Sequence, residues 1–390
     1  MTGGWAGRRV LVTGHTGFKG SWLCTWLLSR GARVSGLALE PEPGPSLFEA
    51  MRLRECIDHA VVDVRHPALV AERVAEVDPE VTFHLAAQSL VRRSYAEPES
   101  TWQVNLNGTI AVMSALTELP GERVAVIVTT DKVYADDPSV FAYREADRLG
   151  GRDPYSASKA AAELACASWR HLASTQSPGL RMAAARAGNV IGGGDWAVDR
   201  LIPDFVRARL AGTALTIRRP TAIRPWQHVL EPLSGYLRLA EHLGEHLGLP
   251  GAQEGVEGRP TEVGAIPPDG NATTGDAPVP PRSILAAVNF GPDPSARRQV
   301  SEVLTLAERH WPGPATVIVP DGPVETATLW LSSDLARGEL GWAPRWDLPR
   351  ALAMTLSWYQ RVAEGADAMA VTREQIAAYE SSPPLAAGSQ

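Results

Sequence analysis

Short apolar runs alternate with longer stretches of helical periodicity through the first half of the chain. The runs expected to form buried strands are residues 9–13, 33–39, 59–64, 81–86, 124–129 and 181–187. Apolar residues recur every three or four positions in segments 18–30, 68–77, 97–119 and 154–173, which predicts helices. This alternation predicts an α/β fold with a doubly wound parallel sheet.

The pattern becomes less regular after Gly188. Shorter segments predict helices at 202–211, 233–247, 300–311 and 349–363, and a strand at 286–290. We therefore expect one domain at residues 1–187 and a smaller lobe at 188–380, some of whose segments return to the first domain. Residues 250–282 contain 13 glycines or prolines among 33 residues and no aromatic residue, so a flexible surface insertion is expected. The tail at 381–390 is expected to be disordered.

Charge and composition exclude several classes of protein. With 37 basic and 44 acidic residues the net charge is −7, which argues against a polybasic nucleic-acid binder, and 44% hydrophobic content argues against a disordered chain. No window approaches about eighteen consecutive apolar residues, so we expect no membrane span. The N-terminus lacks the features of a secretory signal, and a cytoplasmic protein is expected. Cys24, Cys56 and Cys166 are then expected to be reduced thiols rather than a disulfide framework or zinc site.

Lysine is rare, and its positions are informative. Of the 37 basic residues only Lys19, Lys132 and Lys159 are lysine, and the rest are arginine. A lysine ammonium is compact and its pKa shifts readily, whereas a guanidinium is planar and always charged. All three lysines lie in the motifs described below, so we expect each of them to be functional.

A glycine-rich turn joins the first expected strand to the first expected helix. Residues 14–20 read Gly-His-Thr-Gly-Phe-Lys-Gly, a GxxGxxG pattern. The missing side chains let the backbone approach a pyrophosphate, and the helix N-terminus supplies free N–H groups and a partial positive charge. We therefore predict a dinucleotide-binding cradle at Gly14, His15, Gly17, Phe18, Lys19 and Gly20.

The ends of the following strands extend the predicted cofactor site. Glu40 ends the second run, twenty residues after Gly20, where a carboxylate accepts a hydrogen bond from a ribose 2′-hydroxyl and repels a 2′-phosphate. No arginine follows Glu40 closely in the sequence, so NAD is favoured over NADP. Further cofactor contacts are expected where the third and fourth runs end, at Asp63, Val64, Leu85, Ala86 and Ala87.

The predicted catalytic group has two parts. Tyr155 and Lys159 are four residues apart in the expected helix 154–173 and share one face. A nearby ammonium lowers the pKa of a tyrosine, which makes it a usable base towards a sugar hydroxyl during hydride transfer. Thr130, Asp131 and Lys132 follow the fifth run, at the strand end where open α/β sheets bind ligands. An acid beside a potential base is what an elimination of water requires.

Together these motifs resemble a known family. The GxxGxxG turn, the Tyr-x-x-x-Lys pair and the Thr-Asp turn are shared by the extended short-chain dehydrogenase/reductases, which have a Rossmann-like NAD-binding domain. The resemblance covers nearly the whole chain outside 250–282 and the extreme tail. The segments GHTGFKGSWL, TTDK, DPYSASK, RAGNVIGGGDWAVDRLIPD and RPWQHVLEPLSGYL look most like the CDP-glucose 4,6-dehydratase branch. Most sugar-nucleotide 4,6-dehydratases carry Asp-Glu after the threonine, whereas this branch carries Asp-Lys, as Asp131-Lys132 does here.

The resemblance implies a mechanism on CDP-glucose with bound NAD. Tyr155, assisted by Lys159 and Thr130, would remove the 4-hydroxyl proton while the C4 hydride passes to NAD. The 4-ketone acidifies the C5 proton, and Asp131 would protonate the leaving 6-hydroxyl. Lys132 either takes the C5 proton or stabilises the enolate, and both roles stay open. Hydride then returns to C6, and NAD ends unchanged.

The resemblance also implies where the substrate and a second subunit bind. Substrate contacts are expected at Gln88, Asn189, Arg200, Leu201, Arg224 and His228. Arginine forks suit the oxygens of the nucleotide diphosphate. Segments 97–119 and 154–173 lie where family members form the four-helix bundle of a homodimer.

Other functions fit parts of the pattern. A nucleotide-sugar epimerase of the same fold would keep Tyr155 and Lys159 but would have no use for an Asp-Lys couple. A non-catalytic NAD-binding regulator would keep the cradle, yet such proteins typically lose the tyrosine or the lysine. His242 and His246 are spaced for a metal on a helix, but they have no third ligand nearby, so we expect an exposed helical face and no metal.

Overall fold

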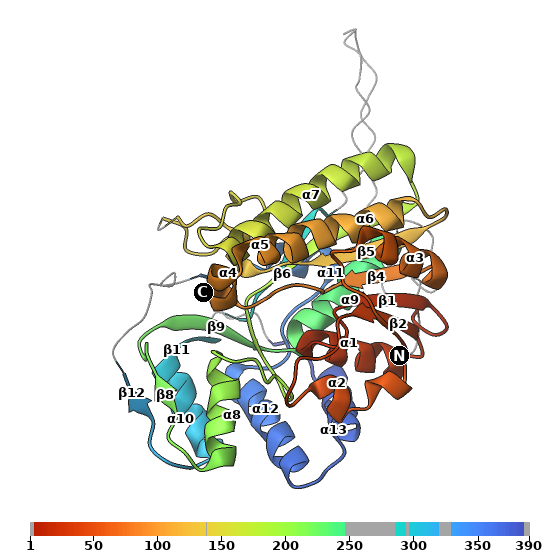
Figure 1. Ribbon diagram of the computed structural model, residues 1–390. Helices are drawn as coiled ribbons and strands as arrows, with labels where there is room; N and C mark the ends of the chain where they lie inside the picture. The colour runs from red at the N-terminus through yellow and green to blue at the C-terminus, as the bar shows by residue number, and fades with distance from the viewer. Residues whose placement is uncertain (1–3, 138, 246–284, 294–295, 320–328, 386–390) are drawn as a thin grey trace, which may run out of the picture.

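The protein is built around one parallel seven-stranded sheet (Figure 1). The computed structural model describes residues 4–137, 139–245, 285–293, 296–319 and 329–385. Along the sheet the strands lie in the order β10 (Ala287–Phe290), β6 (Leu180–Ala187), β5 (Arg123–Val128), β4 (Val81–His84), β1 (Arg9–Thr13), β2 (Arg33–Ala38) and β3 (Asp58–Val61). Every neighbouring pair is parallel, which confirms the predicted doubly wound sheet and gathers the carboxyl ends of its strands on one side.

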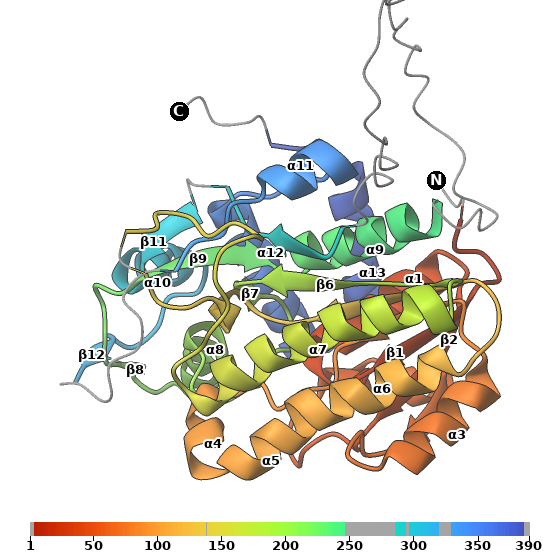
Figure 2. The ribbon, with the colours of Figure 1, turned by 90° about the horizontal axis from the view of Figure 1, so that it is seen from above.

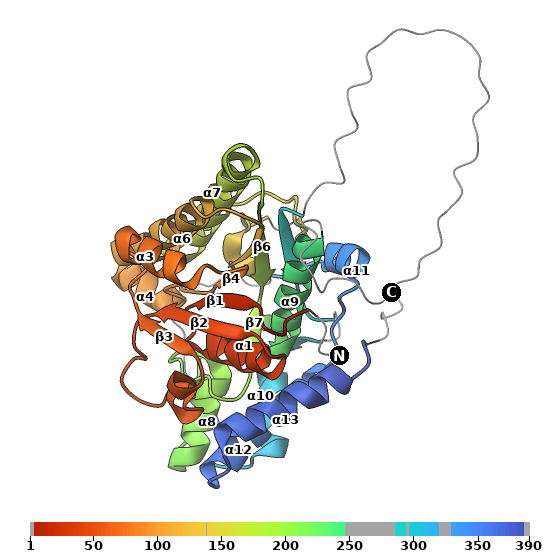
Figure 3. The ribbon, with the colours of Figure 1, turned by 90° about the vertical axis from the view of Figure 1, so that its right-hand side faces the viewer.

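Helices bury the central strands on both faces. β5 reads RVAVIV and is buried at every position, because a parallel strand covered on both sides needs a continuous apolar run rather than an alternating one. One face carries α3 (Pro67–Val77), α6 (Gly108–Thr117) and α7 (Pro154–Gln176), and the other carries α1 (Phe18–Ser29) and α9 (Leu230–Glu245) (Figure 3). The helices of the crossovers therefore cover both faces of the sheet, as in a Rossmann-like fold.

The helix expected at 97–119 is interrupted. Helix α5 (Pro98–Trp102) passes through a π-helical turn at Gln103–Asn107 into α6, and the short helix α4 (Val91–Ala96) precedes it (Figure 2). The π turn buries the polar side chain of Asn105 against α7, where it donates to Ser158 Oγ at 2.9 Å. Single π turns of this kind are frequent at functional sites.

A smaller lobe continues from the end of β6 (Figure 2). Its sheets are β11 (Arg297–Gln299), β9 (Ile223–His228) and β7 (Asn189–Ile191), and the pair β8 (Thr216–Ile217) and β12 (Val317–Ile318). Its helices are α8 (Leu201–Ala211), α10 (Val300–His310), α11 (Asp334–Leu340), α12 (Leu348–Ala363) and α13 (Ala368–Ser381). β10 and α9 return to the large sheet, so the second half of the chain contributes to both parts.

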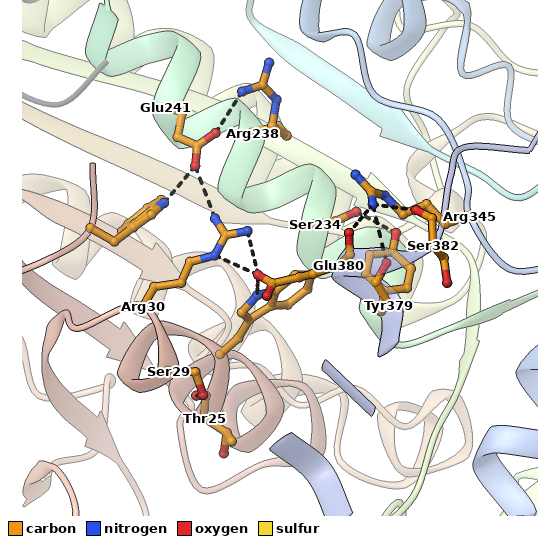
Figure 4. Close-up of polar contacts among 12 residues, drawn as sticks. Thr25, Ser29, Arg30, Ser234, Arg238, Glu241, Arg345, Tyr379, Glu380 and Ser382 are labelled. Carbon is orange, nitrogen blue, oxygen red and sulfur yellow. Dashed lines mark hydrogen bonds and ion pairs between the residues drawn. The ribbon is translucent and has the colours of Figure 1, made fainter. Parts of the chain in front are cut away.

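The C-terminal helix is tied to the first helix by charged side chains (Figure 4). Arg30, which ends α1, pairs with Glu380 at 3.0 Å and with Glu241 of α9 at 3.4 Å. The expected disorder of the tail is wrong for residues 381–385. Ser382 Oγ accepts a hydrogen bond from the buried Trp346 indole at 2.9 Å, a tertiary contact that local composition does not reveal. Residues 386–390 and the insertion 250–282 lie outside the described residues.

The structure bears on two sequence expectations, the absence of a membrane span and the state of the three cysteines. Among the residues that the structure describes, no helix is long and apolar enough to cross a membrane. Cys24 and Cys166 are buried free thiols, and Cys56 is an exposed free thiol. None of the three cysteines is therefore part of a disulfide.

Candidate active site

The glycine turn between β1 and α1 has the geometry of a phosphate cradle. Gly14 has φ of +72°, and a Cβ there would lie 2.7 Å from the backbone nitrogen of Ala86. A Cβ on Gly20 would collide with the carbonyl oxygen of Gly14. No side chain caps the start of α1, and its first turn has no acidic residue. The open N–H groups and the partial positive charge of this helix end therefore fit a dinucleotide pyrophosphate.

His15 lies beneath the cradle rather than in it. Its imidazole is fully buried, and its Nε2 lies 2.6 Å from His59 Nδ1. A Cβ on Gly36 would lie 2.5 Å from the His15 ring, so β2 presses directly against it. Burial and the neighbouring His59 lower the pKa of His15 to about 4, which keeps it neutral. We therefore assign the His15 side chain to support of the turn.

The expected ribose carboxylate has an arginine beside it. Glu40 is exposed just beyond β2, and Arg54 Nη2 pairs with its Oε2 at 2.6 Å. This hydrogen bond lowers the pKa of Glu40. No arginine follows Glu40 closely in the sequence, but the chain folds back over fourteen residues and brings Arg54 to it. The carboxylate remains the group that follows β2 at the position for a ribose hydroxyl.

The other expected cofactor residues line the ends of neighbouring strands. Leu85, Ala86 and Ala87 are half-buried after β4, and the Ala86 N–H donates to Thr13 Oγ1 at 3.1 Å. Asp63 is held by Arg65, whose Nη2 lies 2.6 Å from its Oδ2 and lowers its pKa. Val64, Phe18, Gly17 and Lys19 complete the predicted set: Val64 is buried, and the others border the turn.

Tyr155 and Lys159 lie in the first turns of α7, as predicted. Asp153 caps this helix by accepting from the Ser156 N–H at 2.9 Å, and Pro154 occupies its first position. Burial raises the pKa of Tyr155 to about 12, while a hydrogen bond with Thr130 opposes the rise. The sequence argument expected the neighbouring ammonium to lower this pKa. In the protein alone the loss of water around the phenol raises the pKa instead, and the positive charge that opposes this rise is that of Arg200.

Lys159 is buried and oriented by the backbone. Its Nζ donates to the carbonyl oxygen of Val128, the last residue of β5, at 3.1 Å. Burial and the positive charge of Lys19 lower the pKa of Lys159 to about 8, and Glu163 opposes this change. The ammonium is thus fixed at the carboxyl end of β5, on the same helical face as Tyr155.

Asp131 is the buried acid of the site. It begins a short 3₁₀ turn, η3 (Asp131–Val133), and its Oδ1 accepts from Thr130 Oγ1 at 3.0 Å. Burial raises the pKa of Asp131, against the positive charges of Lys132, Lys19 and Arg224. Lys132 and Lys19 both act on the same carboxylate, and Lys19 also acts on Lys159. The three lysines of the chain therefore converge on one place, as their rarity suggested.

The expected substrate residues fall into two groups. Arg200 and Arg224 lie close enough to the reacting residues to shift their pKa values, Arg200 acting on Tyr155 and Arg224 on Asp131. Arg200 also pairs with Asp195 at 2.9 Å. Asn189 is half-buried in β7, the strand that continues from β6. These three residues border the carboxyl end of the large sheet, where ligands of this fold bind.

Three other expected substrate residues make internal contacts. His228 is fully buried, with its ring 5.7 Å from that of Trp22 and 4.9 Å from that of Trp346. The substrate contact expected of His228 is therefore replaced by a packing role. Gln88 donates to Thr101 Oγ1 at 2.9 Å and so shapes the loop after β4. Leu201 begins α8 and packs on the hydrophobic core.

The buried polar residues that position the site were not identified from the sequence. Asn105 bridges the loop after β4 and α7, since its Oδ1 accepts from the Gln88 N–H at 2.9 Å. Glu163 of α7 and Arg186 of β6 form a buried ion pair. The sequence signal that could have identified them is a polar residue inside an otherwise apolar helix or strand. Polar and charged side chains are buried mainly when they have a partner, so such a residue indicates a buried polar contact.

No metal centre accompanies these residues in the described part of the chain, where no three metal-ligating side chains gather. His242 is half-buried in α9, and His246 lies outside the described residues. The chemistry available is therefore that of a phenol, an ammonium, a carboxylic acid and a dinucleotide cradle.

Comparison with known proteins gives consistent relatives. Residues 10–248 match the model of the NAD dependent epimerase/dehydratase family. A CDP-glucose 4,6-dehydratase of Salmonella typhimurium is 38% identical over 384 residues, which cover 97% of each chain. Two crystal structures share the fold at 19% identity. A UDP-glucose 4-epimerase of Thermotoga maritima has a TM-score of 0.71, covering 91% of this chain and 99% of its own. A dTDP-glucose 4,6-dehydratase of Bacillus anthracis in complex with NAD has a TM-score of 0.68, covering 91% and 97%.

Proposed function

Because the chain belongs to the NAD dependent epimerase/dehydratase family, we propose that it converts CDP-D-glucose to CDP-4-dehydro-6-deoxy-D-glucose and water. The observation that carries the proposal is the buried carboxyl of Asp131 beside Tyr155, Thr130 and Lys132. Oxidation alone requires only the tyrosine and the lysine. A carboxylic acid whose pKa is raised adds the proton donor that a departing hydroxyl requires.

The cradle of Gly14, Gly17 and Gly20 with Glu40 would hold NAD, and NAD when bound accepts a hydride from C4 of the sugar and returns it to C6. Tyr155 takes the proton of the 4-hydroxyl as the ketone forms. Since the pKa of Tyr155 is about 12 in the protein alone, this step depends on nearby positive charge, which Arg200 supplies. The oxidation then makes the C5 proton acidic.

Asp131 donates its proton to the departing 6-hydroxyl, which leaves as water. Burial raises the pKa of Asp131 and so favours the protonated form of this carboxyl, the form that can donate. Lys132 follows directly in η3. As a neutral amine it would take the C5 proton, and the ammonium so formed would stabilise the enolate oxygen. An ammonium suits this task because its positive charge stabilises the negative charge that develops on the oxygen during the elimination.

The test is turnover of CDP-glucose by the purified protein with added NAD. We expect a 4-keto product without net NADH, because the hydride returns to the sugar. Sustained NADH accumulation would instead indicate a simple dehydrogenase. No turnover of CDP-, dTDP-, GDP- or UDP-hexoses would leave a non-catalytic NAD-binding regulator.

A nucleotide-sugar 4-epimerase is the second candidate, since solved epimerases share the fold. An epimerase returns the hydride to C4 and needs no acid at C6. The buried position of Asp131 favours the dehydratase. The two are separated by the product of CDP-glucose, a 4-keto-6-deoxy sugar or an equilibrium mixture of C4 epimers.

We further propose a cytoplasmic homodimer built through the helices of one face. Leu164 on α7 is 63% exposed, and Trp102 on α5 is 37% exposed. These apolar side chains occupy the outer surface of α5 and α7, where two copies could form a four-helix bundle. Light scattering of the wild type and of Leu164→Glu tests this: we expect a dimer that the charge shifts towards monomer.

A further inference from the structure

A buried ion pair joins helix α7, which carries Tyr155 and Lys159, to strand β6. Glu163 of α7 and Arg186 of β6 are 5% and 3% exposed. Arg186 Nε lies 2.8 Å from Glu163 Oε1 and 2.9 Å from Oε2, and its Nη2 also donates to Oε2. Two-oxygen contact of this kind fixes the planar guanidinium and the carboxylate in one geometry. A buried pair is weak evidence for stability as such, so its contacts must be considered for another role.

The pair holds both ends of the turn that carries Thr130, Asp131 and Lys132. On the N-terminal side, Thr129 Oγ1 donates to Glu163 Oε1 at 2.5 Å. On the C-terminal side, Tyr134 Oη accepts from Arg186 Nη1 at 2.6 Å. The turn η3 lies between these two anchors.

The second anchor is itself secured. Tyr134 Oη donates to Asn289 Oδ1 at 2.8 Å, and Asn289 belongs to β10 at the edge of the sheet. The Arg186 guanidinium also lies 4.8 Å from the centre of the Tyr134 ring. The turn is thus attached to β6, β10 and α7 through buried side chains.

Glu163 also faces the catalytic ammonium. It is four residues after Lys159 on α7, on the same helical face. The other titratable groups around Lys159 are Lys19 from α1, His84 from β4 and Tyr155 on its own helix. Burial lowers the pKa of His84 to about 3, so His84 is neutral, and Lys19 is a cation. Glu163 supplies the negative charge of this group, and Arg186 balances it.

We propose that Glu163 and Arg186 are positioning residues of the reaction: the pair clamps both ends of the turn bearing the catalytic acid and sets the charge balance at Lys159. The proposal rests on the dehydratase function proposed above. It assigns opposite effects to its two members. Removal of the Glu163 carboxylate leaves the positive charge of Arg186 uncompensated near Lys159. Removal of the Arg186 guanidinium leaves the negative charge of Glu163 uncompensated there instead.

The test is the pH dependence of kcat for CDP-glucose turnover in Glu163→Gln, Arg186→Met and the double variant. If Lys159 must be protonated, its pKa sets the alkaline limb of the profile. We expect this limb to move to lower pH in Glu163→Gln and to higher pH in Arg186→Met, each by roughly half to one pH unit. The double variant should lie within about 0.3 unit of the wild type, because removing both partners leaves no uncompensated charge. Glu118→Gln, an exposed glutamate at the end of α6, is the matched control and should not shift the limb.

The clamp has its own test in Thr129→Val, which keeps the shape of the side chain and removes the hydrogen bond to Glu163. We expect kcat to fall about tenfold while KM for CDP-glucose stays within twofold. This variant also decides the matter if the single charge variants do not fold.

The proposal would be overturned if the alkaline limb moved in the same direction in Glu163→Gln and Arg186→Met. It would also be overturned by a kcat of Thr129→Val within twofold of wild type. A wild-type protein that does not turn over CDP-glucose would overturn the dehydratase function instead. The two failures are therefore distinguishable.

Discussion

Gly188 packs against Asp131, the proposed catalytic acid, and we expect its replacement by alanine to slow the elimination step selectively. The residue lies between β6 and β7 and does not have a positive φ. A Cβ there would lie 2.9 Å from Asp131 Oδ2 and 3.4 Å from Pro225 Cγ. Relief of the first contact requires the carboxylate to move by about 0.3–0.5 Å, since carbon and oxygen normally remain at about 3.2–3.4 Å or more.

The displacement is small, but the carboxylate is buried and held by Thr130 at 3.0 Å. A misplacement of about 1 Å costs about 10²-fold in rate, so we expect Gly188→Ala to lower kcat roughly tenfold. The free energy of unfolding should change by less than about 1 kcal/mol, because mild overpacking is offset by the lower entropy of the unfolded alanine chain.

The assay is stopped-flow absorbance at 340 nm with saturating CDP-glucose on the NAD-loaded enzyme. Tyr155 is not displaced, so oxidation should proceed while elimination slows, and enzyme-bound NADH should accumulate towards the enzyme concentration. Gly338→Ala is the matched control, because a Cβ there meets no atom within 4 Å. A wild-type kcat in Gly188→Ala, or a slow turnover without the 340 nm signal, would refute the placement of Asp131 as the acid of the elimination.

Three further predictions follow from the same geometry. Tyr155→Phe should lower kcat by about 10²–10⁴-fold while the variant still binds NAD, measured by turnover and by cofactor content; full activity would contradict its role as the base. Lys132→Arg, which keeps a cation but has no accessible neutral form, should retain measurable turnover if the residue stabilises the enolate, and a complete loss with intact NAD binding would assign it the C5 proton. Burial raises the pKa of Glu231 from 4.5 to about 7. The protonated carboxyl therefore stabilises the folded state fully below pH 4.5, and this stabilisation is lost as pH rises through 7. It contributes about 3 kcal/mol to the free energy of unfolding. The melting temperature of Glu231→Gln relative to wild type should therefore increase between pH 5 and pH 8, and a constant difference would contradict this.

The large sheet was predictable because its signals are local. Continuous apolar runs such as β5, and glycines where strand turns into helix, reflect burial on both faces and close backbone contact. The strands β7, β9 and β11 were not predicted. β7 and β11 have three residues each, and β9 pairs with them only across long stretches of chain. The helix α13 was missed for a similar reason, since its burial depends on α1 and α12.

The candidate site also has parts that the sequence predicts and parts that it does not. The positions of Tyr155, Lys159 and Asp131 near the carboxyl end of β5 were predictable, because the sequence places them at a fixed helical spacing and directly after a strand. The direction of the Tyr155 pKa shift was not predictable, since it depends on how much water the fold removes. Arg54 beside Glu40 and the buried position of His228 also depend on tertiary contacts that no sequence spacing encodes.

The central claim is that one hydride leaves C4 and returns to C6 of the same sugar while Asp131 releases the 6-hydroxyl. Turnover of CDP-glucose labelled with deuterium at C4, followed by mass and NMR analysis of the product, tests this most directly. The account predicts that the deuterium is found at C6 of a 4-keto-6-deoxy sugar. Deuterium remaining at C4, or lost from the sugar into a pool of labelled NADH, would contradict it.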